Sequence, residues 1–183
     1  MIANFVTSTR IALLVPLFFF VQAEPSGSWA ALAVFLLAGL TDVIDGRLAR
    51  TLNQVSRFGA MLDLLADRLL TFTVLVGLIS GGALKGGFLV AALILLARDL
   101  IVASFGESVP NLGFKVSNTE KVKITFQFLG IGLLISPRFF EIYGEDQHSI
   151  GRYAISISAA LTCVTLITYS RRTLAALEEM RRP

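Results

Sequence analysis

The sequence predicts an all-α membrane protein, and three observations support this. Of the 183 residues, 55% are hydrophobic and only 16% are charged, and the mean hydropathy of +0.74 exceeds what the core of a soluble domain of this size requires. The apolar residues gather in runs that could cross a bilayer core, which takes roughly 20 residues per helix. These runs lack the alternation of barrel strands, so helices are expected, because backbone groups in hydrocarbon must be paired within their own segment.

Six transmembrane helices are predicted, in a single membrane domain that covers residues 1–183. The expected spans are residues 5–22, 29–45, 63–80, 84–105, 122–142 and 150–170. The first is expected to be a retained span, because the chain start lacks the basic and small-residue pattern of a cleaved signal peptide. Residues 171–183 carry four arginines around two leucines and are expected to form a short interfacial helix on anionic lipid.

The basic residues predict which ends of the helices face the cytoplasm. One side is rich in them and carries Arg47, Arg50, Arg57, Lys115, Lys121, Lys123, Arg171, Arg172, Arg181 and Arg182. The other side carries Lys85, Arg138 and Arg152. Because basic loops stay in the cytoplasm, both termini are expected there, in a bacterial-type inner membrane. The turns at residues 24–28 and 81–82 and the loop at residues 141–149 then face outward, with His148 as a solvated loop residue.

The charge pattern argues against a nucleic-acid-binding protein, and the single cysteine argues against a disulfide or a cysteine metal site within the chain. The net charge of +3 does not indicate a nucleic-acid partner, because the basic residues lie between apolar runs without interleaved aromatic residues. Anionic phospholipid and phosphate groups are the expected partners instead. The single cysteine, Cys163, can form neither a disulfide nor a cysteine metal site within one chain, and it is expected to be a packing residue in the last span.

Four carboxylates lie at the predicted cytoplasmic ends of the second and third spans. Asp42 and Asp45 are three residues apart, and Asp63 and Asp67 are four apart, so each pair occupies one face of a helix. An acid in a membrane helix costs about 2.5 to 3.5 kcal/mol at the bilayer centre, less near the interface, and normally faces a cavity or a partner. The two faces can converge across the helix hairpin.

Converged carboxylates repel one another unless positive charge lies among them. Oxygen-only ligation suits hard cations such as Mg²⁺, Mn²⁺ or Ca²⁺, and two such ions would bind a pyrophosphate and stabilise an in-line displacement. The competing interpretation is a surface charge network in which these acids pair with Arg47, Arg50, Arg57 and Arg68. Such a network requires neither this spacing nor the glycines beside the acids.

Two glycines remove side-chain bulk next to the carboxylates. Gly46 follows Asp45, and Gly59 lies four residues before Asp63, so a flat group could approach the helices at these points. Each glycine alone could equally serve a turn or a close helix contact. Arg50 can direct a planar donor fork at a phosphate, although topology explains a basic residue there almost as well.

The combined pattern resembles the signature of the CDP-alcohol phosphatidyltransferase family. The segment reads Asp42-x2-Asp45-Gly46-x2-Ala49-Arg50-x8-Gly59-x3-Asp63-x3-Asp67. The N-terminal Asn4-x2-Thr7-x2-Arg10 also looks like that family, although Ala3 stands where proline is common. Six helices with cytoplasmic termini fit as well, so the resemblance covers most of the chain.

The resemblance implies a site and a reaction. Asp42, Asp45, Asp63 and Asp67 would hold two Mg²⁺ or Mn²⁺ ions, and the CDP group of CDP-diacylglycerol would lie against residues of the same motif. These donor-binding residues are Asp42, Gly46, Ala49, Arg50, Gly59 and Asp63. Asp67 would act as the base for the acceptor hydroxyl, which attacks the β-phosphorus and expels CMP. The family also implies a homodimer.

The acceptor half looks like that of phosphatidylglycerophosphate synthases. The similar residues are Ala97-Arg98-Asp99 through Gly113, Lys121-x-Lys123 and Gln127. Arg98 with Lys115, Lys121 and Lys123 could gather a phosphomonoester, which suits glycerol 3-phosphate. The lysines could instead only enforce topology, and Arg98 could form a salt bridge with Asp99 or with an acid of another helix.

Several departures keep a second acceptor open. Glu120 replaces a usual glycine, Ile124 a usual threonine, Gly106 a frequent arginine and Leu64 a usual proline. Residues 49–68 look more like phosphatidylinositol synthases, so inositol or inositol phosphate is the alternative acceptor.

Two alternatives come from other classes of protein. An intramembrane prenyltransferase would also bind pyrophosphate through magnesium and acidic helix ends, but it gives no reason for Gly46 or for Ala49-Arg50. A non-enzymatic cation carrier predicts acids at mid-membrane depth, whereas these four cluster at one interface.

Overall fold

The computed structural model describes residues 2–23, 28–51, 57–108, 118–137, 141–142 and 145–180. Side chains are described for residues 7–22, 28–41, 59, 61–102, 119–137, 146–167 and 170–171. Lys115 therefore lies outside the described residues. Asp42, Asp45, Gly46, Ala49 and Arg50 lie in a described helix, but their side chains are outside the described set.

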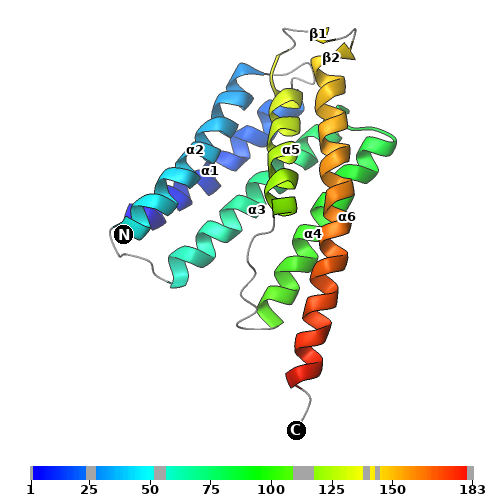
Figure 1. The fold of residues 1–183 in the computed structure, drawn as a ribbon. Helices are drawn as coiled ribbons and strands as arrows, with labels where there is room; N and C mark the ends of the chain where they lie inside the picture. The colour runs from blue at the N-terminus through cyan, green and yellow to red at the C-terminus, as the bar shows by residue number, and fades with distance from the viewer. Residues whose placement is uncertain are drawn as a thin grey trace.

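The described chain forms six helices and one very short pair of strands (Figure 1). The helices are α1 (Ile2–Ala23), α2 (Trp29–Thr51), α3 (Arg57–Ser80), α4 (Gly87–Ser108), α5 (Asn118–Ile135) and α6 (Gln147–Met180). Between α5 and α6, strand β1 (Glu141–Ile142) pairs antiparallel with β2 (Glu145–Asp146), with Glu141 opposite Asp146. The prediction of an all-α protein with six helices is confirmed.

Four predicted boundaries differ clearly from those of the helices. Helix α2 continues to Thr51 rather than ending at residue 45, and α3 begins at Arg57 rather than at residue 63. The fifth helix ends at Ile135 rather than at residue 142, because Pro137 disfavours a helical residue before it and lacks the N–H that would continue the ladder. Residues 171–180 are not a separate interfacial helix but continue α6. This stretch has no glycine or proline and consists mainly of good helix formers, so nothing in it interrupts the helix.

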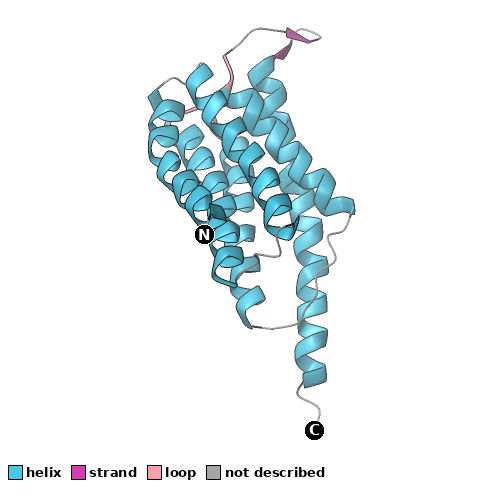
Figure 2. Ribbon diagram, turned by 90° about the vertical axis from the view of Figure 1, so that its left-hand side faces the viewer, coloured by secondary structure: helices cyan, strands magenta, loops and turns pink. Residues whose placement is uncertain are grey.

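The helices pack through stripes of small and aliphatic residues. Helix α1 contacts α2 and α3, and α6 packs against α4 and α5 (Figures 1 and 2). The largest fully buried side chains include Leu17, Phe35, Leu75, Leu95, Ile131 and Ile155. Every one of the six helices contributes one of them, so a single core runs through the described bundle.

Glycines allow α5 and α6 to approach closely. A Cβ atom on Gly130 of α5 would lie 3.0 Å from the carbonyl oxygen of Gly151 on α6, and a Cβ on Gly151 would lie 3.0 Å from the oxygen of Gly130. The two backbones therefore approach more closely than side chains would allow, as small residues permit in membrane helix pairs.

The corner between α5 and α6 is held by capping side chains. Asp146 Oδ1 accepts hydrogen bonds from the backbone N–H groups of His148 (2.6 Å) and Ser149 (3.0 Å), which caps the start of α6. The Gln147 side chain donates to the carbonyls of Leu133 (3.2 Å) and Pro137 (2.9 Å) at the end of α5. These bonds pair backbone groups that helix ends leave open.

His148 and Cys163 differ from their predicted environments. His148 is only 2% exposed, and its Nε2–H donates to the Ser136 carbonyl at 3.0 Å, so it caps α5 and is not a solvated loop residue. Cys163 on α6 is exposed rather than a packing residue within this chain. Its neighbours Val164 and Ile167 are each 57% exposed, so this side of α6 presents apolar side chains outward.

One described helix meets the length and composition requirements for crossing a membrane. Among the described residues, Gln147–Ile167 of α6 is long and apolar enough to cross a membrane by length and composition. Thr7–Gln22 and Trp29–Thr41 are shorter apolar stretches. Six spans therefore stay a prediction.

Candidate functional site

An arginine of α1 meets one of the predicted metal ligands on α3. Thr7, Arg10, Leu14 and Leu17 recur at intervals of three and four residues and are all buried, so they form the inner stripe of α1. Arg10 is the charged member of this stripe, with a side chain only 2% exposed. Its Nη1 donates to Asp63 Oδ1 across 3.4 Å. The structure thus joins the N-terminal motif to the carboxylate motif.

Helix α3 presents two of the predicted carboxylates at one end. Asp63 heads an inner stripe that continues through the buried residues Ala66, Leu70 and Val74, and its own side chain is 42% exposed. Asp67, one turn further, is exposed. Residues four apart lie on one helix face, so both carboxylates can be reached from the same side.

The other two predicted metal ligands lie at the corresponding end of α2. Asp42 and Asp45 are in the last three turns of that helix, with Gly46, Ala49 and Arg50, but the positions of their side chains are outside the described set. Within the described residues, no three His, Cys, Asp or Glu side chains are grouped to hold a metal ion. The two described carboxylates suit a hard cation in type, and convergence of all four stays a prediction.

A second charged cluster joins α4 to α5. Arg98 follows the buried Ala91 and Leu95 on the inner stripe of α4, and its side chain is 14% exposed. Its Nη1 donates to Asp99 Oδ1 at 3.1 Å, and its Nη2 forms an ion pair with Glu120 of α5. The salt bridge considered from sequence, with Asp99 or an acid of another helix, is therefore present with both partners.

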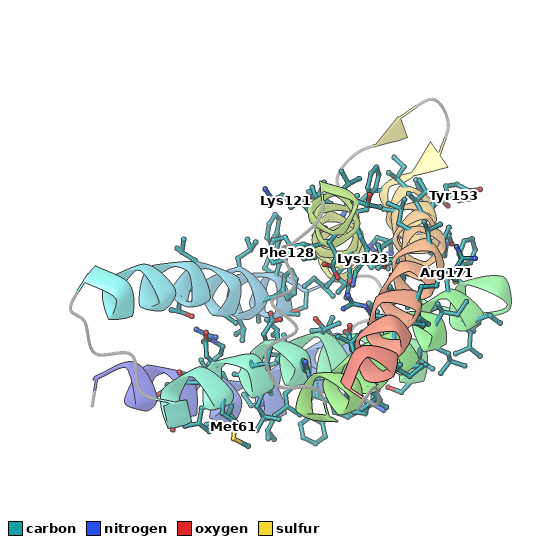
Figure 3. All side chains as sticks on the ribbon, turned by 60° about the horizontal axis from the view of Figure 1, so that its bottom comes forward. Met61, Lys121, Lys123, Phe128, Tyr153 and Arg171 are labelled. Carbon is teal, nitrogen blue, oxygen red and sulfur yellow. The ribbon has the colours of Figure 1, made fainter. Side chains whose placement is uncertain are left out.

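Lys123 extends this cluster toward Asp67. It is 3% exposed and lies on a buried stripe of α5 with Gln127, Ile131 and Leu134. In Figure 3 its side chain points into the bundle. The described charged groups near enough to act on it electrostatically include Arg98, Asp99, Glu120 and, most weakly, Asp67. The Ser158 hydroxyl of α6 donates to its backbone carbonyl at 3.1 Å, which ties this turn of α5 to α6.

Lys121 does not join Lys123. Residues two positions apart on a helix are separated by about 200° around its axis, so Lys121 and Lys123 lie on different faces. Lys121 is exposed and points away from the bundle in Figure 3. Of the four predicted acceptor residues, the structure brings Arg98 and Lys123 together, leaves Lys121 on the outer face, and does not describe Lys115.

Two residues at this site were not predicted as functional. Arg10 was visible only as part of the N-terminal motif, and its spacing from Leu14 and Leu17 already indicated an inward position. Glu120 was visible only as an unusual residue before Lys121. Its carboxylate offsets the charge of Arg98, a role that no local pattern in the sequence indicates.

Comparison with known proteins gives a consistent match over most of the chain. A family model described as CDP-alcohol phosphatidyltransferase matches residues 1–168. The CDP-diacylglycerol–glycerol-3-phosphate 3-phosphatidyltransferase of Wigglesworthia glossinidia brevipalpis is 32% identical over 165 residues, 86% of each chain. The protein of the same name from Haemophilus influenzae is 32% identical over 172 residues, 90% of this chain and 89% of that one.

A solved structure has a similar fold. The crystal structure of apo phosphatidylinositol phosphate synthase from Mycobacterium tuberculosis superposes with a TM-score of 0.60 and 22% identity, over 87% of this chain and 85% of that chain. This similarity concerns the arrangement of the helices, because its sequence identity is too low to carry an acceptor across.

Proposed function

Because the chain belongs to the CDP-alcohol phosphatidyltransferase family, we propose that it transfers a phosphatidyl group from CDP-diacylglycerol to glycerol 3-phosphate and releases CMP. The observation that carries this proposal is the position of the buried Lys123 beside the Arg98 ion pairs and near enough to Asp67 for the two charges to interact. It links a carboxylate of the donor motif with cations suited to an acceptor phosphate. The names of relatives such as the Haemophilus influenzae protein support this acceptor.

In this proposal the donor half is built by α2 and α3. Asp42, Asp45, Asp63 and Asp67 would hold two Mg²⁺ or Mn²⁺ ions, and Gly46, Ala49, Arg50 and Gly59 would contact the CDP group of the donor. When bound, the ions would supply positive charge to the pyrophosphate oxygens. Arg10, which donates to Asp63, would fix the orientation of that carboxylate.

Asp67 is the proposed base. Its exposed carboxylate would accept the proton of the acceptor hydroxyl as the hydroxyl oxygen bonds to the β-phosphorus. The bond between this phosphorus and the oxygen of the CMP leaving group breaks, and the electron pair leaves with CMP. General-base catalysis of this kind contributes typically 10²- to 10⁴-fold.

The proposed acceptor site is formed by Arg98 and Lys123, with added charge from Lys121 on the outer face of α5 and from Lys115, which lies outside the described residues. The Arg98 Nε atom is buried and has no hydrogen-bond partner among the described residues, so the guanidinium retains a donor beyond those used by Asp99 and Glu120. A phosphomonoester is the group that such donors recognise well. Lys121, exposed on α5, would act at longer range as part of the field that attracts the anion.

The same proposal includes the setting of the enzyme. Residues 1–183 would form one domain with six membrane spans, with both termini and the active site on the cytoplasmic side of a bacterial-type inner membrane, as a homodimer. Large exposed apolar side chains such as Val15, Leu40 and Leu100, at 62%, 57% and 66% exposure, suit a lipid environment. Family membership favours this enzyme over an intramembrane prenyltransferase or a cation carrier.

Inositol or inositol phosphate is the second candidate acceptor. The observation in its favour is Glu120, whose ion pair with Arg98 lowers the positive charge available to a phosphomonoester. The deciding experiment uses purified protein with CDP-diacylglycerol and Mg²⁺, with labelled glycerol 3-phosphate, inositol, inositol phosphate and serine in separate reactions. CMP release and labelled lipid only with glycerol 3-phosphate support the proposal. Preferred use of inositol or inositol phosphate contradicts the acceptor, and absence of CMP release with every alcohol contradicts the reaction.

A further inference from the structure

A small cavity lies at the end of the bundle away from Asp63 and Asp67. It has a volume of about 280 Å³ and is lined by the turn between α3 and α4 and by the first turns of α4 and α6. With a rise of about 1.5 Å per residue, the end of α3 at Ser80 lies about 25 Å from Asp63. The cavity is thus separate from the proposed transferase site.

Two cations line this cavity, and local contacts position one of them, Arg152. Arg152 Nη2 donates to the Ser149 hydroxyl at 2.8 Å, and its guanidinium lies 5.7 Å from the centre of the Phe88 ring. Gly82 has a φ of 77°, and a Cβ atom there would lie 2.8 Å from Lys85 Cε. The absence of a side chain at this left-handed position therefore leaves room for Lys85 to lie across the turn.

The described residues that line the cavity include two cations and no carboxylate. Neither Lys85 nor Arg152 forms an ion pair with a carboxylate among the described residues. The nearby Asp146 accepts hydrogen bonds from the backbone of His148 and Ser149, so its Oδ1 is occupied in capping α6. Two cations beside a hydroxyl form a site suited to a phosphate group, to which they would donate charge-assisted hydrogen bonds.

An apolar stripe leads away from the cavity along α6. Tyr153, which lines the cavity, is followed at helical spacing by Ile157, Val164 and Ile167, with exposures of 51%, 44%, 57% and 57% in that order. Phe88 and Tyr153 meet edge to face with ring centres 6.0 Å apart, and Tyr153 points outward from α6 in Figure 3. A tyrosine between a polar cavity and an apolar surface is typical of the membrane interface.

We propose that this cavity binds the phosphate of an anionic glycerophospholipid, with Lys85 and Arg152 as its charge partners and the acyl chains along the α6 stripe. The inference rests on the membrane placement proposed above. The volume of about 280 Å³ is just below the range of roughly 300 to 1,000 Å³ usual for small-molecule pockets, so it suits a headgroup rather than a whole lipid. The continuous apolar stripe favours a lipid over free phosphate.

Lipid binding to purified full-length protein in detergent tests the inference by native mass spectrometry. The probes are dioleoyl phosphatidylglycerol, dioleoyl phosphatidylcholine and inorganic phosphate, with CDP and Mg²⁺ present to occupy the proposed donor site. Wild type should bind phosphatidylglycerol at least about tenfold more tightly than phosphatidylcholine, a difference of about 1.4 kcal/mol. The double variant Lys85→Gln/Arg152→Gln should bind both lipids within twofold of each other. Arg171→Gln, which removes an exposed charge near the other end of α6, should keep the preference.

Three results would overturn the inference. In the first, the double variant keeps the preference for phosphatidylglycerol. In the second, inorganic phosphate displaces the lipid at equal concentration. In the third, the double substitution removes a second protein subunit from the complex instead of a bound lipid, so the cations would hold another copy of the chain. Lys85→Gln alone provides the same test if the double variant fails to fold, because Lys85 is exposed and should tolerate replacement. CMP release from CDP-diacylglycerol with glycerol 3-phosphate, measured on the same protein preparations in separate reactions without CDP, separates the proposals: its absence with the lipid preference intact refutes only the proposed reaction.

Discussion

Arg10 of α1 donates from Nη1 to Oδ1 of Asp63 on α3 across 3.4 Å, although 53 residues separate them. The arginine is almost completely buried, whereas the aspartate is 42% exposed. A buried guanidinium therefore contacts a carboxylate that is itself partly exposed. Partners of this kind orient metal ligands and influence their affinity.

The first prediction concerns this pair. Replacement Arg10→Gln should lower apparent Mg²⁺ affinity by about 10- to 100-fold, the usual effect of losing a partner that orients a ligand. Arg10→Lys should recover part of the loss, because lysine keeps the charge but lacks the planar fork. Metal titration of CMP release measures the effect, with Val15→Ala on the exposed face of α1 as the control. Unchanged metal dependence in Arg10→Gln would show that the arginine serves only packing.

Metal removal is the second prediction. Because the proposed ligands are carboxylates without histidine or cysteine, activity should be lost in excess chelator and restored by Mg²⁺ or Mn²⁺. Calorimetric titration of the protein with Mn²⁺ gives a readout that is independent of turnover. Full CMP release in excess chelator, from protein shown to contain no retained metal, is the result that rules this prediction out.

Asp67 and Asp63 should differ in what their replacement changes. Asp67→Asn should lower kcat by about 10²- to 10⁴-fold if general-base catalysis is lost, with a much smaller change in donor affinity. Asp63→Asn, as the matched carboxylate one turn away, should mainly weaken metal and donor binding. Donor affinity and single-turnover rates of both variants measure this difference. If Asp67→Asn loses donor binding as severely as Asp63→Asn, Asp67 is chiefly a metal ligand.

The number and order of helices could be predicted from the sequence because each helix contains a long apolar run. The end of α5 was missed since Pro137 lies within an apolar stretch that hydropathy treats as continuous. His148 was assigned to solvent because polar residues surround it in the sequence. Its burial depends on the end of α5, a contact between segments that no local pattern contains.

The sequence predicted which residues belong to the candidate site better than it predicted which of them contact one another. Asp63 and Asp67 stand out because acids are costly in apolar helices, and the salt bridge of Arg98 was one of two interpretations. The different faces of Lys121 and Lys123 follow from helix spacing alone, but identifying the inner face requires knowing which neighbours α5 contacts. The partnership of Arg98 with Glu120 similarly depends on the packing of α4 against the start of α5.

The two lysines provide a matched comparison for the fourth prediction. Lys123→Gln should raise the KM for glycerol 3-phosphate by about tenfold or more, because a charge-assisted hydrogen bond contributes about 1.5 to 3 kcal/mol and 1.4 kcal/mol is tenfold. Lys121→Gln, on the exposed face, should raise it only about twofold, with the donor KM unchanged in both. Steady-state kinetics per correctly folded molecule measure this contrast. Normal kinetics combined with poor membrane insertion would assign both lysines to topology.

The fifth prediction concerns Glu120, which stands where the acceptor half of the resembled phosphatidylglycerophosphate synthases usually has a glycine. Its ion pair with Arg98 should compete with an acceptor phosphate for the guanidinium. Removing the carboxylate in Glu120→Gln should therefore lower the KM for glycerol 3-phosphate by about 3- to 10-fold, less than the effect of a full charged hydrogen bond because Asp99 still pairs with Arg98. Asp99 at 3.1 Å would still hold Arg98, so the fold should persist.

Comparing two acceptors and two variants distinguishes two roles of Glu120: competing with the acceptor phosphate for Arg98, or orienting Arg98 toward it. Glu120→Gly adds a loss of helix propensity of about 1 kcal/mol, whereas Glu120→Gln preserves the size of the side chain, so only the effect shared by both variants reports on charge. The KM for uncharged inositol, where turnover permits its measurement, should not fall, because inositol presents no anion to Arg98. A higher KM for glycerol 3-phosphate in Glu120→Gln, with the donor KM unchanged, would mean that Glu120 orients Arg98 for the acceptor, and the predicted competition would then be wrong.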